Sequence, residues 1–454
     1  MRKWLHKPKL VWGNLRSSLW FLPSLIVAAS VVLAVALIDA DSAVTDEWMA
    51  RWPRLFGAGA AGARGMLSTI AGSMMSVVGV TFSMTLVAFA MASSQYTSRI
   101  LRNFMRSRLT QAVLGVFAGI FTYCLIVLRT IRGGDEGAFV PGLAVFFGFV
   151  LAVGGVGVLI FFIHHVASSI QASSIIASAA EETIEAIDRL FPKKLGNSLE
   201  ESGEGQSPLP VDVRKWYIVP ADESGYIQGV DNDGLLRLAK MRKTVVRMER
   251  GVGEFVIENT PLASLTLEAP PDSETISELQ AAFGISRHRM VEQDAAFGIR
   301  QIVDVALKAL SPGINDTTTA VTCVDYLAMV LARLAPQHIP VSHRYEDGAL
   351  RVIAKGPSFQ SLLSDAFDQI RESAKGNLGI MLSLLGSMQT IASLTSDPSR
   401  RHALHEQVEW IADLAKRTLE SPRDRTRFDR RLAQVHEALK VELVLPIHEQ
   451  PNNT

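Results

Sequence analysis

Four long stretches of the chain contain no charged side chain, and they constrain its fold more than any other feature. Each is at least 20 residues long and rich in apolar residues, which is the length that a helix needs to cross a bilayer. A backbone in lipid must satisfy its own hydrogen bonds, so these stretches are expected to be helices. The stretches are 17–38, 65–98, 109–128 and 137–180, and they predict membrane spans near 19–38, 67–92, 110–128 and 139–163.

The formal net charge of zero conceals two halves of opposite charge. Residues 1–165 hold 14 basic and 6 acidic residues, a net charge of +8, and the remainder holds 31 basic and 39 acidic residues, a net charge of −8. The segments 1–18 and 93–108 contain basic residues and no acidic ones. Because basic loops favour the cytoplasmic side, both termini are expected there. A cleaved signal peptide is the alternative for the first span, but its apolar run is long for one.

The second half predicts a cytoplasmic α+β domain that is mostly helical, attached to the multi-pass α-helical membrane domain. The fourth span is expected to continue as one helix until Pro192 ends it. Composition and hydrophobic periodicity divide the chain further. The predicted parts are a membrane domain (1–165), a helix continuing from the fourth span (166–192), a linker (193–212), a β-rich subdomain (213–268), a mainly helical domain (269–445) and a flexible tail (446–454).

Two strings in this half indicate hairpins. RYEDGALRVIAK, at 344–355, carries Asp-Gly between β-prone residues, which is typical of a two-stranded turn. GEFVIENTPLASL is similar to the hairpin of lipoyl-type domains, but Glu258 and Asn259 stand where those domains carry their modified lysine. The similarity therefore implies architecture only.

The second predicted span is rich in hydroxyl side chains. A purely lipid-facing helix does not need them, and they could line a hydrated path without placing a charge in the membrane. Close packing between helices, which also favours small residues and Ser/Thr, is the alternative and the commoner use. No Asp, Glu, Lys or Arg lies inside any predicted span, which argues against proton pumps. The candidate path-lining residues are Ser73, Ser76, Thr81, Ser83 and Thr85.

A second candidate site lies in the predicted helical domain, where a ligand could contact Gln293, Asp294, Arg300, Asp304, Asn315 and Asp316. The better supported alternative is structural. Arg300 and Asp304 are spaced as an i,i+4 pair on a solvated helix face, and Asn315 or Asp316 is a natural N-cap for the helix that follows.

The sequence contains no recognisable enzyme signature. It lacks a phosphate-binding Walker loop, a nucleophile elbow and a zinc-protease motif. We therefore predict no catalytic residue, no cofactor and no metal site. The zero net charge gives no indication of nucleic-acid binding.

Several long strings of the chain are distinctive together. They include SSQYTSRILRNFMRSR, FVPGLAVFFGFVLAVGGVGVLIFFIHHVASSIQ and QDAAFGIRQIVDVALKALSPGINDTTTA. In these strings the chain resembles a bacterial family of predicted membrane proteins, the domain of unknown function numbered twenty-two fifty-four. The resemblance covers roughly 10–445 and implies a multi-pass protein of the bacterial inner membrane. Thr317 stands where proline is expected after Asn-Asp, which could loosen the start of the next helix.

Three functions remain open from the sequence. The leading hypothesis is a homo-oligomeric channel or transport-like protein, with the bilayer and further copies of the chain as partners and an unknown solute. The alternative is a membrane scaffold or sensor whose cytoplasmic domain binds a protein or a small ligand. A membrane-tethered enzyme would need a pocket with clustered ionisable groups around 293–316.

Overall fold

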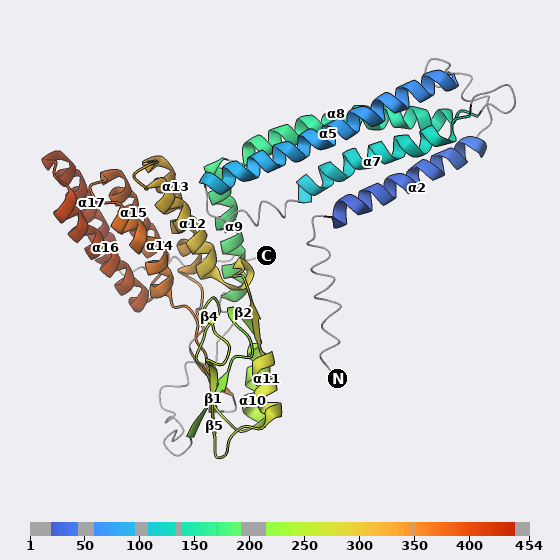
Figure 1. Ribbon diagram of the computed structural model, residues 1–454. Helices are drawn as coiled ribbons and strands as arrows, with labels where there is room; N and C mark the ends of the chain where they lie inside the picture. The colour runs from blue at the N-terminus through green and yellow to red at the C-terminus, as the bar shows by residue number, and fades with distance from the viewer. Residues whose placement is uncertain are drawn as a thin grey trace, which may run out of the picture. The chain divides into compact units, whose positions relative to one another are not determined.

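The computed structural model describes residues 20–43, 59–95, 108–132, 139–169, 171–191, 215–340, 342–346 and 348–440. These residues form two compact units, a first unit within Met1–Ser174 and a second unit within Ile175–Thr454 (Figure 1). The predicted linker (193–212), the predicted tail (446–454), the basic segment 1–18 and most of the segment 93–108 lie outside the described residues.

Within its described residues the first unit contains four long helices, one on each predicted span. They are α2 (Phe21–Ala43), α5 (Ala60–Gln95), α7 (Arg108–Thr130) and α8 (Gly142–Ser169). All four are long and apolar enough to cross a membrane. The α7 helix packs against each of the other three, and it buries the largest share of its residues. It is therefore the central helix of this unit.

Two glycines let α7 and α2 approach closely. A Cβ atom on Gly115 would lie 2.9 Å from the Pro23 Cα atom, and one on Gly119 would overlap the Ser30 hydroxyl. No larger side chain fits at either position without moving α2. The Gly-x-x-x-Gly pattern of this span thus serves helix packing, the use for which the pattern is known.

Polar side chains of the first unit bond to backbone groups near the helix ends. The Tyr123 hydroxyl donates to the Ala144 carbonyl (2.7 Å). The buried Asp41 carboxylate accepts the Leu143 amide (3.0 Å) at the start of α8. Arg64 Nη2 donates to the Ile131 carbonyl (2.7 Å) just after α7 ends. These bonds join three pairs of helices without a charge at mid-helix depth.

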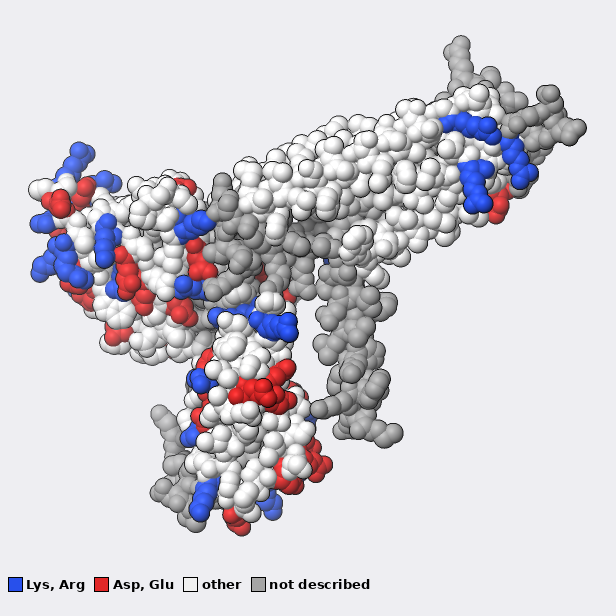
Figure 2. Space-filling model, viewed as in Figure 1, with Lys and Arg blue, Asp and Glu red and all other residues white. Residues whose placement is uncertain are grey.

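The outer surface of the first unit is apolar over most of its length. Large side chains such as Val32, Phe82 and Ile160 are exposed on α2, α5 and α8. Figure 2 shows these helices white between their ends, with basic and acidic residues gathered at one end. Such a surface suits lipid, where exposed apolar side chains carry no hydration cost.

A fifth helix also satisfies the length and apolarity of a membrane span. It is α13 (Thr317–Leu334), so the prediction of four such helices is one short. The α13 helix packs against α12, α14 and α15 of the second unit, and its Leu327 and Leu331 are fully buried there. Asp325 accepts the Ser383 hydroxyl of α15 (3.2 Å). The apolar residues of α13 therefore form part of the core of a helical bundle.

The prediction of one continuous helix from the fourth span to Pro192 is wrong. The α8 helix ends at Ser169, and α9 (Ala172–Leu190) begins after an interruption. There the Gln171 amide donates to the Ser168 carbonyl (3.3 Å), and the Ser168 hydroxyl donates to the His164 carbonyl (2.9 Å). The same kind of bond occurs inside the unbroken α5 helix, at Ser76 and Thr81, so serine content weakens the helix here without by itself ending it.

The second unit contains two small sheets. One has the strand order β1-β5-β3-β8-β7, and the other has the order β4-β2-β6. The β3–β8 pair is parallel and the other pairs are antiparallel. The strands are β1 (Lys215–Pro220), β2 (Gly225–Val230), β3 (Val246–Met248), β4 (Phe255–Val256), β5 (Pro261–Leu267), β6 (Phe283–Ser286), β7 (His343–Glu346) and β8 (Ala349–Ile353).

The sheets extend beyond the predicted β-rich range of 213–268. Strands β6, β7 and β8 lie outside this range. They belong to the sheets because β6 pairs with β2 and β8 pairs with β3. Val246 faces Val352 across the parallel pair. Contacts between residues so far apart leave no local pattern. The hairpin predicted at 344–355 is confirmed, since β7 and β8 are antiparallel and Gly348 has the positive φ of 72° that its turn requires.

The similarity to a lipoyl-type hairpin is not upheld. Strand β4 pairs with β2, whereas β5 pairs with β1 and β3, so the two strands of the string belong to different sheets. Asn259 lies between them with a φ of 62°, in the left-handed region. Asparagine tolerates this region better than most residues, so the chain can turn sharply there and change sheets.

Helices complete the second unit. Leu235 and Leu279, on α10 and α11, are fully buried in the core beneath the larger sheet. The remaining helices stack beside one another from α12 to α17, as Figure 1 shows in yellow to red. Besides α9, the helices described in this unit are α10 (Asn232–Met241), α11 (Ser273–Ala281), α12 (Ala295–Ala309), α13, α14 (Phe359–Ser373), α15 (Leu378–Ala392), α16 (Pro398–Thr418) and α17 (Pro422–Lys440), with a short 3-10 helix at Val291–Gln293.

The α9 helix is part of this bundle. Arg333 of α13 makes a two-pronged ion pair with Asp188 of α9 (2.6 and 2.7 Å), and Gln337 donates to the same carboxylate (3.2 Å). A Cβ atom on Gly298 of α12 would overlap the hydroxyl of Thr183, which is buried. The glycine therefore allows α9 and α12 to lie in close contact.

Candidate functional site

One face of α5 is formed by glycines and hydroxyl side chains. Glycine is followed four residues later by Thr or Ser, and this pattern repeats every seven residues, in Gly65–Thr69, Gly72–Ser76 and Gly79–Ser83. Residues spaced in this way share one side of a helix. All six are exposed, and a Cβ atom on any of the three glycines would meet open space. We call this surface the small-residue face.

The predicted path-lining residues divide between two faces of α5. Ser76 and Ser83 belong to the small-residue face, and Ser73 is exposed beside it. Thr81 is fully buried against the other helices, and its hydroxyl donates to the Val77 carbonyl (2.7 Å). Thr85 is half-buried and donates to the Thr81 carbonyl (2.7 Å). The structure thus brings three of the five hydroxyls together and turns two towards the bundle.

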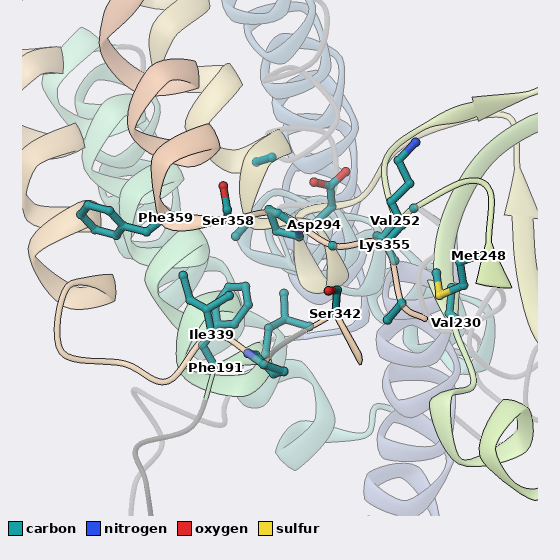
Figure 3. Close-up of a pocket in the computed structure, with 18 of the residues that line it drawn as sticks. Phe191, Val230, Met248, Val252, Asp294, Ile339, Ser342, Lys355, Ser358 and Phe359 are labelled. Carbon is teal, nitrogen blue, oxygen red and sulfur yellow. The ribbon is translucent and has the colours of Figure 1, made fainter. Parts of the chain in front are cut away.

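A cavity of about 780 Å³ lies in the second unit, between the sheets and the helices. The N-terminal ends of α12, α14 and α16 reach it, together with residues of β2, β3 and β7 and the loop that follows β8. Figure 3 shows Val230, Val252, Met248 and Ile339 on its apolar walls, with Asp294, Lys355 and Ser358 between them. Its size and mixed lining suit a small-molecule ligand.

Two predicted ligand residues, Gln293 and Asp294, line this cavity. The Asp294 side chain is 5% exposed and forms an ion pair with Arg289 (2.8 Å). It also caps α12 by accepting the Phe297 amide (3.0 Å). Gln293 packs so closely against Gly229 that a Cβ atom there would overlap its side-chain amide. Asp294 is therefore held by two partners of its own chain.

The cavity carries three basic side chains. Lys355 Nζ lies 2.8 Å from Glu254. Arg400 donates to the carbonyls of Ala335 (2.6 Å) and Gln337 (2.9 Å) and lies 3.6 Å from Asp397. Arg344 differs from these, because among the described residues it has neither an ion pair nor a hydrogen-bond partner for its Nε atom, which is shielded from solvent.

The loop after β8 leads directly into α14 at the cavity. Ala354, Lys355, Gly356 and Pro357 line the cavity, and Ser358 is the N-cap of the helix. The Ser358 hydroxyl accepts the Ser361 amide (3.1 Å) in a capping box. A strand, a short glycine-containing loop and a helix N-terminus follow one another here, which is an arrangement suited to anions.

The other predicted ligand residues do not line the cavity. Arg300 and Asp304 form the expected i,i+4 ion pair (2.9 Å) on α12. Asp316 caps α13 by accepting the Thr319 amide (3.0 Å) and hydroxyl (2.6 Å), and Asn315 precedes it with a φ of 50°. Thr317 does not loosen this helix, since α13 begins there and its hydroxyl accepts Asn377 Nδ2 (2.9 Å).

Sequence reasoning missed Arg344, Lys355, Ser358 and Arg400. Arg344 and Lys355 lie within the predicted hairpin, and the position of Lys355 between a strand and a Gly-Pro-Ser loop was the available signal for that residue. Arg400 lies in a strongly charged stretch of sequence that does not indicate a shielded side chain, yet it is 13% exposed. Among the residues that the structure describes, no three His, Cys, Asp or Glu side chains are placed to hold a metal ion.

The chain is similar to proteins from mycobacteria over most of its length. Uncharacterized protein Rv1290c of Mycobacterium tuberculosis is 31% identical over 434 residues, which cover 93% of this chain and 80% of the relative. Uncharacterized protein Mb1321c of Mycobacterium bovis shows the same identity and coverage. No solved structure matches the chain. The family described as "Predicted membrane protein (DUF2254)" matches residues 16–390, and the chain therefore belongs to this family of membrane proteins.

Proposed function

We propose that this membrane protein is a homo-oligomeric channel or transport-like protein of the inner membrane, in which α5 lines the path. The observation that supports the proposal is the small-residue face. It lies opposite the buried face of α5, which contains Leu67, Met74 and Thr81, and within the described residues of the first unit no other helix covers it. A face of glycines and hydroxyls is a poor lipid surface but a good lining for water.

The chemistry of this face limits what it could conduct. Ser76 donates its hydroxyl to the Gly72 carbonyl (3.1 Å), which leaves the serine oxygen as an acceptor towards the outside. No charged side chain lies between Arg64 and the end of the described span of α5. Such a lining offers dipoles and no fixed charge. The proposal is therefore a passive path and not an ion-coupled carrier.

The test measures self-association and solute flux on the same set of variants. Gly72→Leu and Gly79→Leu fill open space on the small-residue face, so the chain itself should still fold. Met75→Leu changes an exposed side chain on another side of α5 and serves as the control. We expect wild-type and control proteins to form oligomers by mass analysis and to release solutes from liposomes, and both glycine variants to lose these properties. Monomeric, flux-free wild-type protein would refute the proposal.

The proposed orientation places the second unit in the cytoplasm. The basic segments 1–18 and 93–108 support it through the positive-inside rule. A green fluorescent protein fused after Thr454 should fluoresce, and alkaline phosphatase fused at the same place should be inactive. The opposite pair of results would reverse the topology.

A second candidate function is a membrane sensor whose second unit binds a small ligand. The cavity of about 780 Å³ favours it, because pockets of roughly 300–1,000 Å³ are usual for small-molecule sites. The two functions are compatible, since a ligand in the second unit could regulate a path in the first. Ligand binding to protein that carries no flux would favour the sensor alone.

A further inference from the structure

The pairing of charges around the cavity of the second unit is uneven. Each carboxylate that lines it already has a basic partner. Glu254 contacts Lys355 (2.8 Å) and Arg250 (3.5 Å). Asp294 contacts Arg289 (2.8 Å), and Asp397 contacts Arg400 (3.6 Å). The lining itself balances, with Lys355, Arg344 and Arg400 against three carboxylates. Among these three basic side chains, Arg344 differs because it has no ion pair within the described residues.

Arg344 is the basic side chain of the cavity that has no carboxylate partner among the described residues. It lies on the edge strand β7 and lines the cavity. Its Nε atom is shielded from solvent and has no hydrogen-bond partner among the described residues. A shielded donor without an acceptor is costly, and the cost is larger for a charged group. An anion in the cavity would provide the Arg344 guanidinium with a counter-ion.

The backbone adds a second feature that favours an anion. The α14 helix has 15 residues and begins at the cavity with Phe359 and Gln360. Its capping box satisfies the Ser361 amide and leaves the amides of its first two residues without an acceptor among the described residues. Free amides and the positive end of the helix dipole attract phosphate at such a position.

The remaining walls suit the uncharged part of a ligand. Val230, Val252, Met248 and Ile339 line the cavity from β2, β3 and two loops. Its volume of about 780 Å³ is far larger than one phosphate group needs, since a water molecule occupies roughly 30 Å³. The ligand therefore has an organic body as well as an anionic end.

We infer that the cavity binds a phosphate monoester of a small organic molecule, with the phosphate between Arg344, Lys355 and the N-terminus of α14. The inference adds a ligand class to the sensor function and does not depend on a path in the first unit. Failure to bind phosphate esters and failure to conduct are thus separate results. A soluble metabolite and a lipid headgroup could both supply this chemistry.

Calorimetric titration of the full-length protein in detergent tests the inference. The probes are adenosine monophosphate and glycerol 3-phosphate, with adenosine and glycerol as their uncharged counterparts and inorganic phosphate as the anion alone. We expect at least one monoester to bind more tightly than inorganic phosphate, and neither uncharged counterpart to bind. Binding of glycerol 3-phosphate in preference to the nucleotide would indicate a headgroup-like ligand, and the reverse a soluble one. If neither monoester binds, the inference is wrong.

Arg344→Gln is the decisive variant, and Arg351→Gln is its matched control. Arg351 lies on the neighbouring strand β8 and also has an Nε atom without a partner, but it does not line the cavity. We expect Arg344→Gln to weaken monoester binding by about tenfold or more, since a charge-assisted hydrogen bond is removed, and Arg351→Gln to leave it unchanged. Unfolding temperatures without ligand check that both variants fold. Equal effects of the two variants on affinity would overturn the assignment.

Discussion

The contact between α9 and α12 provides a sharp test of the second unit, through the variant Gly298→Ala. Alanine normally stabilises a helix by roughly 0.5–1 kcal/mol relative to glycine. At Gly298, however, the new Cβ atom would overlap the Thr183 hydroxyl and lie 2.9 Å from the Thr183 Cβ atom. Threonine is stiff at χ1 and this one is fully buried, so it cannot turn away. Overpacking of this kind costs about 1–3 kcal/mol.

The steric cost exceeds the gain in helix propensity, so we expect a net loss of about 1–2 kcal/mol in the free energy of unfolding. For a unit of this size, each kcal/mol lowers the unfolding temperature by roughly 2–4 °C. Thermal unfolding of the purified full-length protein measures the shift. Gly379→Ala is the control, because a Cβ atom at this helical position makes only ordinary contacts, at 3.4 and 3.8 Å.

A double-mutant cycle identifies the cause. Thr183→Ala removes the hydroxyl and the methyl group that crowd position 298, so the double variant should lose less stability than the two single variants together. A coupling free energy of about 1 kcal/mol or more is expected for residues in such contact. Strict additivity, or a Gly298→Ala variant as stable as Gly379→Ala, would refute the close packing of α9 on α12.

Three further variants test separate contacts. Asp316→Ala should reduce stability by about 1 kcal/mol at neutral pH, because it removes the N-cap of α13. Hydrogen bonds from the Thr319 hydroxyl and amide lower the pKa of Asp316 in the folded protein. The stability that the ionised carboxylate contributes is therefore present above the unfolded pKa of about 3.9 and is lost as pH falls through the folded pKa. Unfolding measured along an acid titration should show the difference in stability between wild type and variant closing in that range. Arg333→Ala should lower the free energy of unfolding by about 1 kcal/mol, since its pair with Asp188 is bidentate but partly exposed. Chemical unfolding measures this loss, and an unchanged free energy would show that the pair does not contribute to stability. Gly119→Val should shift the unfolding of the first unit downwards, because the space is filled by Ser30 of α2; unchanged detergent stability would contradict the α2–α7 contact.

The four helices of the first unit could be predicted because lipid imposes a simple rule on sequence. A run of about 20 apolar residues without charge has few other uses. The α13 helix reaches the length and mean apolarity of a span, but it contains Asp325 and Arg333, and its Leu327 and Leu331 fill the core of the helical bundle. Apolar composition records burial and does not specify what surrounds the helix.

The site in the second unit was only partly predictable. The pairing of Arg300 with Asp304 and the capping by Asp316 follow from local spacing, and the structure contains both contacts. The cavity depends on segments near 250, 294, 344 and 400 that the fold brings together. Arg344 gives no local signal, because the lack of a partner for its side chain exists only in three dimensions.

The parallel pairing of β3 with β8 has a consequence for how the chain is made. Strand β3 lies inside its sheet, but its neighbour β8 is synthesised only after α11, α12 and α13. Until then the nascent chain presents one open edge of β3, and open strand edges promote pairing with the wrong partner. The helices of the first unit emerge from the ribosome earlier and can already be inserted in the membrane. The late strand β8 therefore completes the larger sheet only after the helices of the first unit have formed, and α14 to α17 are synthesised after it.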